Sequence, residues 1–180
     1  GMYAALLGIS ALSKEETNHT AEFLHTLTIG RCGILTGKLG AIFTLLALFD
    51  AAALGVFKGS AAIIGESLSM KCLLGYIAAQ LAAQVEIASV CFALSAFSKR
   101  SGMGMGLGIA LVLYVLDIAA RIAEEADFLK YITPFSYSNA TDVFVNKGSI
   151  EAVPLCIGAG ITLAGLAAAY IVYRKRDIAA

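Results

Sequence analysis

Three acidic residues lie inside apolar stretches of the chain, and these are the residues best placed to do chemistry. Asp50, Glu86 and Asp117 each have long runs of hydrophobic neighbours. A carboxylate is costly in lipid, so such residues face a helix bundle or an aqueous path and often mark translocation or coupling sites. We interpret Asp50 as a pathway residue. For Glu86 and Asp117 we expect hydrogen-bonded packing, with Arg121 pairing with Asp117 across one helical turn.

The other motifs do not assemble a catalytic or nucleotide-binding site. A phosphate loop that contains Gly37 and Lys38 would require Gly where the chain has Cys32, and Ser or Thr where it has Leu39. His19 and His25 are six residues apart and do not share a helix face. The four cysteines form no CxxC pair, which favours a role as small apolar side chains. We therefore expect a protein that is not an enzyme and that binds no metal or cofactor of its own.

The composition indicates that lipid is the solvent of this chain. Of the 180 residues, 59% are hydrophobic and 14% are charged, whereas soluble domains usually carry about 25% charge. The net charge is +0, which gives no basic surface for nucleic acid. No linker, charge block or repeat divides the sequence. We predict an all-α, polytopic transmembrane helix bundle that forms one domain over residues 1–180.

Four apolar segments are long enough to cross a membrane. They are residues 39–57, 72–97, 103–122 and 153–173. About twelve apolar residues at the start of the chain cover only about 18 Å of a ~30 Å core. We interpret this run as the end of a preceding span. Gly104 and Gly108 form a GxxxG pair, from which we expect close helix packing.

The basic residues predict the orientation of these spans. Eight Lys and Arg lie in residues 13–38, 98–102 and 174–180, against five on the other side. The richer side is predicted to be cytoplasmic. The longest outer connection, residues 123–152, carries four aromatic side chains: Phe128, Tyr131, Phe135 and Tyr137. Aromatic residues with polar tips are typical of a membrane interface, although an ordinary loop is the alternative.

The cytoplasmic segment after the first apolar run has the pattern of an amphipathic helix. Ser13 and Glu16 have the spacing of a capping box. One face of the following helix would carry Thr20, Phe23, Leu24 and Leu27. Such a helix either lies among lipid headgroups or presents its polar face to a cytoplasmic partner, and the pattern leaves both alternatives open.

Residues 8–24 resemble the permeases of type 2 ABC exporters. In that family a spanning helix ends in a small-residue turn, followed by an acidic pair and a T-x-E-F-L motif, here Glu15-Glu16 and residues 20–24. Arg31 and Gly37-Lys38 match the continuation. One departure is visible, because residues 28–31 lack the proline that often precedes the family's arginine.

Two further motifs occur in the family's order. Thr133-Pro134-Phe135 is similar to the outer turn before the last helix, and residues 173–178 are similar to the family's Arg-Asp-Ile ending. The resemblance implies a multi-pass subunit of the cell membrane, namely a prokaryotic plasma membrane. It also implies six spans, of which this sequence lacks the N-terminal elbow and the first.

The resemblance further implies a permease dimer that works with cytoplasmic ATPase subunits, which would bind and hydrolyse ATP. Residues 14–27 would then form the coupling helix. The residues that we expect to carry coupling are Glu15, Glu16, Thr20, Glu22 and Phe23. The alternative is an ion- or proton-coupled secondary transporter that uses Asp50 and Glu86. That class is expected to show paired interrupted helices, which the sequence does not.

Overall fold

The computed structural model describes residues 1–17, 31–65, 69–97, 103–122 and 124–175. Every regular element in these ranges is a helix. The elements are α1 (Met2–Thr17), α3 (Arg31–Ile64), α4 (Met70–Phe97), α5 (Met103–Ile122), η1 (Glu124–Tyr131), α6 (Ala140–Val145) and α7 (Ala152–Lys175). Four described helices are long and apolar enough to cross a membrane, namely Gly33–Ile64, Met70–Phe97, Met103–Ile122 and Ala152–Tyr173. The predicted multi-pass, all-α fold is confirmed.

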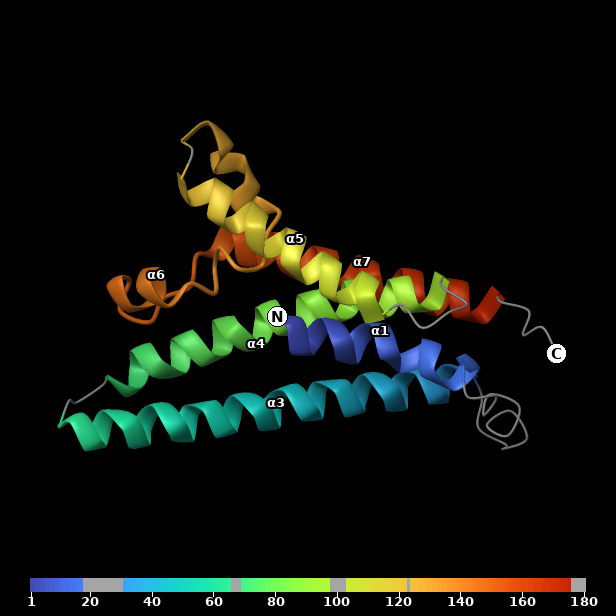
Figure 1. Ribbon diagram of the computed structural model, residues 1–180, viewed down its shortest axis with the longest axis horizontal. Helices are drawn as coiled ribbons and strands as arrows, with labels where there is room; N and C mark the ends of the chain where they lie inside the picture. The colour runs from blue at the N-terminus through green and yellow to red at the C-terminus, as the bar shows by residue number, and fades with distance from the viewer. Residues whose placement is uncertain (18–30, 66–68, 98–102, 123, 176–180) are drawn as a thin grey trace.

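Helix α4 is the centre of the bundle, with α1, α3 and α7 packed around it (Figure 1). Two hydrophobic clusters share its surface. In the first, Phe92 packs with side chains of α1, α3 and α7, among them Leu46 and Ala169. In the second, Cys91 packs with Ile9 of α1 and Ala110 of α5. Because α4 contacts neighbours on several sides, its apolar residues are distributed around the helix instead of along one stripe.

Glycines decide where the helix backbones approach most closely. A Cβ at Gly8 of α1 would collide with the carbonyl oxygen of Ala88 in α4, and a Cβ at Gly106 of α5 would lie 2.8 Å from an α1 side chain. The packing role predicted for Gly104 and Gly108 is wrong within the described chain, since a Cβ at either would meet nothing within 4 Å. Residues two apart on a helix face different directions, so Gly106 and its two neighbours cannot all contact α1.

Helix α3 is longer than predicted. The expected span was residues 39–57, but the helix runs from Arg31 to Ile64 and includes Lys58. The predicted span ended before Lys58 because a charged side chain leaves the hydrocarbon core. The helix itself continues for as long as its backbone hydrogen bonds do. Gly65 supplies that stop with a φ of 79°, a conformation typical of helix C-termini. At about 51 Å, α3 exceeds a ~30 Å hydrocarbon core, so it tilts or extends past it.

The predicted capping box is wrong, because α1 continues through Ser13 to Thr17 and no helix begins at Ser13. Ser and Glu are tolerated inside helices, and a capping box forms only where the backbone already breaks. The Lys38 ammonium donates to the carbonyl of Ala11 at 2.6 Å. This bond joins α1 to α3. The connection between these two helices, residues 18–30, lies outside the described residues. Most of the predicted coupling helix, residues 14–27, falls in that connection.

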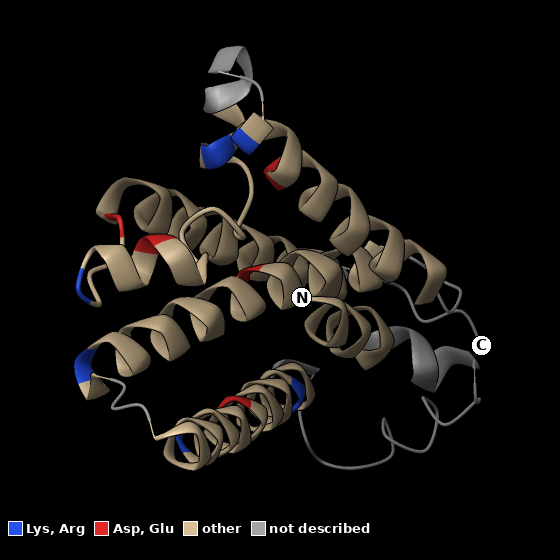
Figure 2. Ribbon diagram, turned by 60° about the vertical axis from the view of Figure 1, so that its left-hand side comes forward, with Lys and Arg blue, Asp and Glu red and all other residues tan. Residues whose placement is uncertain are grey.

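The outer connection is folded, and charged residues gather mainly there and toward the helix ends (Figure 2). Phe128 and Tyr131 are exposed, as expected of interface aromatics. For Tyr137, which is 5% exposed, the interface interpretation is wrong. Phe135 is half-buried and its ring lies 5.8 Å from that of Tyr114. The turn at residues 132–138 directs these side chains inward, and a one-dimensional pattern does not show that direction.

Cysteine labelling tests the orientation, which stays a prediction. In a background without the four native cysteines, Asn139→Cys should react with an impermeant maleimide added outside intact cells, and Asn18→Cys should not. The reason is the excess of basic residues on the side that contains residue 18. Labelling of residue 18 but not of residue 139 would reverse the topology.

Candidate functional site

The first polar contact inside the bundle joins α3 to α4. Asp50 lies near the middle of α3, and both Asp50 and Gln84 of α4 are 3% exposed. The Gln84 amide Nε2 donates to Asp50 Oδ1 at 2.8 Å. The second oxygen of each group, Asp50 Oδ2 and Gln84 Oε1, has no hydrogen-bond partner among the described residues. Each can therefore accept from a further donor, such as a water molecule.

The second polar contact joins α4, the outer turn and α7. The Tyr137 hydroxyl donates to Glu86 Oε2 at 2.7 Å, and both residues are buried. Burial raises the pKa of Tyr137 above its usual range, and the adjacent Glu86 raises it further. The hydroxyl therefore remains protonated and available as a donor. A Cβ at Gly158 of α7 would collide with Glu86 Oε2, so glycine is required for the carboxylate to fit.

These two contacts are separate sites. Gln84 and Glu86 are two residues apart, which places them about 200° apart around the helix axis. Gln84 meets Asp50 on α3, while Glu86 meets Tyr137 and α7. Asp50 and Glu86 consequently have different partners and form no joint carboxylate site among the described residues. The sequence interpretation missed Gln84, although an amide in an apolar span is itself a signal of a buried polar partner.

The predicted ion pair between Asp117 and Arg121 is confirmed. Arg121 Nε lies 2.9 Å from Asp117 Oδ2, and a second guanidinium nitrogen lies 3.2 Å from the other carboxylate oxygen. Arg121 also lies 3.6 Å from Asp142 of α6 and donates to the carbonyl of Phe135 at 3.4 Å. This arginine therefore fastens the end of α5 to the folded outer connection, which is a structural role.

The coupling residues are only partly within the described chain. Glu15 and Glu16 belong to the last turn of α1, while Thr20, Glu22 and Phe23 lie outside the described residues. Their proposed contacts with a partner stay predictions. Asp50 is buried against protein, as expected of an ionisable residue in a spanning helix.

Replacing Tyr137 with phenylalanine should destabilise the bundle by about 2 kcal/mol, because Glu86 loses its hydrogen-bond donor. The matched control is Tyr131→Phe, at a tyrosine that is 47% exposed, and it should change little. Thermal unfolding of both variants in the same detergent measures the difference. Equal effects at the two positions would show that the Tyr137 hydroxyl contributes nothing particular.

These features define a multi-pass helical membrane protein whose buried carboxylates contact side chains of neighbouring helices and of the outer turn. A family model, described as ABC-2 family transporter protein, matches residues 1–178. The chain therefore belongs to the ABC-2 transporter family and is a membrane permease of an ABC transporter. This finding confirms the resemblance. Neither a curated protein nor a solved structure matches the chain.

Proposed function

We propose that this permease exports its substrate with energy from ATP hydrolysis in a partner ATPase subunit. The observation that carries the proposal is the family match over residues 1–178. It is supported by four described helices that can span a membrane. ATP would bind to the partner, and the permease would act as a dimer in a prokaryotic plasma membrane. The chemistry of hydrolysis and the rearrangement of spans would thus belong to different subunits.

Residues 14–27 would form the contact with the ATPase. Glu15, Glu16 and Glu22 would accept hydrogen bonds from basic or N–H groups of the partner. Phe23 would supply an apolar anchor, and Thr20 would lie on the same face. An acidic contact of this kind discriminates against lipid headgroups, which attract basic helices.

The path of a mechanical signal from that contact would begin in α1. This helix continues from the bundle to Thr17 without a break, and Gly8 lets it pack directly on the α4 backbone. Lys38 ties the beginning of α3 to Ala11 at the base of the intervening segment. Motion of the coupling segment would therefore move α1, α4 and the start of α3 together. Asp50 of α3, which contacts Gln84 of α4, is the candidate residue in the transport path.

Purification of the tagged permease from its native membranes tests the proposal. We expect an ATPase subunit to copurify and the complex to show vanadate-sensitive ATP hydrolysis in proteoliposomes. A variant ATPase with its phosphate-loop lysine replaced should copurify without hydrolysis, which controls for a contaminating enzyme. Undiminished transport by the permease in the absence of any ATPase would refute the proposal.

A further inference from the structure

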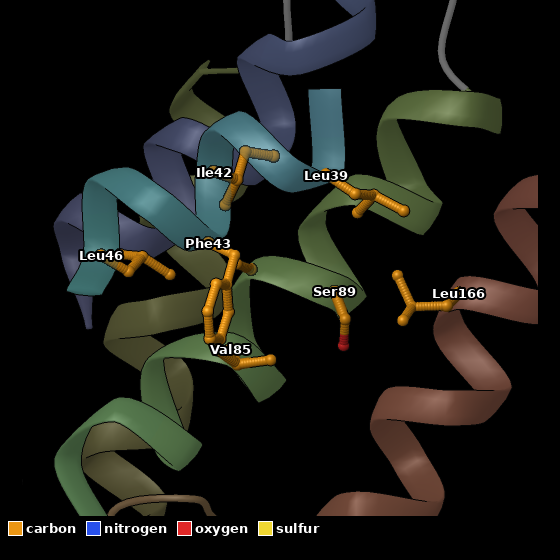
Figure 3. A pocket seen from close by; sticks show the side chains of 8 residues that line it. Leu39, Ile42, Phe43, Leu46, Val85, Ser89 and Leu166 are labelled. Carbon is orange, nitrogen blue, oxygen red and sulfur yellow. The ribbon is translucent and has the colours of Figure 1, made fainter. Parts of the chain in front are cut away.

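A groove runs between α3, α4 and α7. It consists of two hollows of about 150 and 480 Å³, and both are lined by Phe43 of α3 and Val85 of α4. Figure 3 shows Phe43 beside Val85 in the smaller hollow, with Leu166 of α7 across from them. Phe43 is 54% exposed and Leu163 is 68% exposed, so this interhelical groove opens to the outside of the described bundle.

The groove lies at the depth of hydrocarbon. Its floor on α4 extends from Ala78 to Ser89, a length of about 16 Å. Each end of the floor is about 12 Å along the helix from the nearer end of α4, Met70 or Phe97. Water and lipid headgroups lie outside the ~30 Å core, whereas the middle of a spanning helix is surrounded by acyl chains.

The lining is suited to an apolar occupant. The Ser89 hydroxyl already donates to the carbonyl of Glu86 at 2.8 Å, and the Tyr137 hydroxyl to the Glu86 carboxylate. Apart from these two and Thr162, the lining side chains are aliphatic or aromatic or are glycine. A polar solute or hydrated ion would lose its water there without replacement hydrogen bonds. A hydrocarbon chain makes no hydrogen bonds with water, so it has none to lose when it enters the groove.

The groove offers room along the helix axis. Its larger hollow holds about 480 Å³ and extends from Leu155 to Leu163 of α7, a distance of about 12 Å along that helix. Acyl chains surround the middle of a spanning helix, so an acyl chain is the occupant that the membrane itself supplies at this depth.

We propose that an acyl chain of a membrane phospholipid occupies this groove and packs α3 against α4 and α7. The acyl chain would lie on the small residues Ala78 and Ala82 and would cover Phe43. Helix α3 touches α4 and α7 over only part of its length (Figure 1), so a bound chain supplies contacts that protein does not. The inference concerns the bundle itself and stands apart from ATP coupling.

Retention of lipid provides the first test. Ala159 and Ala164 are both exposed on α7, but only Ala159 lines the groove. In native mass spectra of the complete protein in mild detergent, we expect bound phospholipid in the wild type and in Ala164→Phe. Ala159→Phe should reduce it at least tenfold. Equal retention in both variants, or a changed oligomeric state of Ala159→Phe with lipid retained, would overturn the proposal.

A fluorescence measurement tests the same contact without blocking the groove. The sequence contains no tryptophan, so Phe43→Trp adds one reporter in the groove. Leu48→Trp is its control, at a residue of α3 that is 62% exposed and does not line the groove. After exposure to phosphatidylcholine with brominated acyl chains and a detergent wash, residue 43 should stay quenched while residue 48 recovers. Recovery at both positions would show that the groove retains no acyl chain.

Discussion

Replacing Glu22 with alanine should lower ATP hydrolysis by the reconstituted permease–ATPase complex by about 30-fold. Removing one acceptor from a buried charged contact typically costs about 2–5 kcal/mol, and about 1.4 kcal/mol corresponds to a factor of ten. Phe23→Ala should have a similar effect through the loss of an apolar anchor. Glu22 is a cleaner choice than Glu16, because Glu16 belongs to the last turn of α1 and its replacement also changes the end of that helix.

Glu151→Ala is the matched control. Glu151 is an exposed acid just before α7, on the side predicted to lie opposite the ATPase, and its removal should leave hydrolysis unchanged. Equal helicity and equal elution of all variants show that the membrane fold is intact. Unchanged hydrolysis in both Glu22→Ala and Phe23→Ala would remove residues 14–27 from the proposed interface and leave the family membership untouched.

Replacing Gln84 with leucine should destabilise the bundle by about 3 kcal/mol, the second large effect that we expect. Asp50 would then stay buried without its hydrogen-bond donor, and an unpartnered acid in a spanning helix is costly. The double variant Asp50→Leu/Gln84→Leu should regain most of this stability, because two apolar side chains at one contact leave no polar group unsatisfied. Thermal unfolding of the two single variants and the double variant measures the coupling.

A transport measurement distinguishes a packing role of Asp50 and Gln84 from a role in the transport path. If Asp50 belongs to the transport path, Asp50→Leu should reduce transport in proteoliposomes more than it reduces expression, and the stable double variant should remain impaired. Gln80→Leu, an amide one turn earlier on α4, is the control for the loss of a polar side chain. A double variant with wild-type transport would assign Asp50 to packing alone.

The sequence alone determined the class of fold and the number of spans, because these depend on quantities that add up along the chain. Hydropathy over about 20 residues measures whether a segment can replace water by lipid, and no neighbour is needed to evaluate it. The pair of Asp117 and Arg121 was predictable for the same reason, since a separation of four residues fixes two side chains on one helix face. The family motifs likewise lie in consecutive residues.

Only the tertiary structure decided which polar side chains meet. Asp50 is 34 residues from Gln84 and Glu86 is 51 residues from Tyr137. Which of the acids and donors pair depends on the rotation of α4 relative to α3 and α7. That rotation is set by where small residues permit close packing, as at Gly8 and Gly158. In lipid, every face of a spanning helix can be apolar, so hydrophobic periodicity does not reveal the buried face, and contacts between helices decide it.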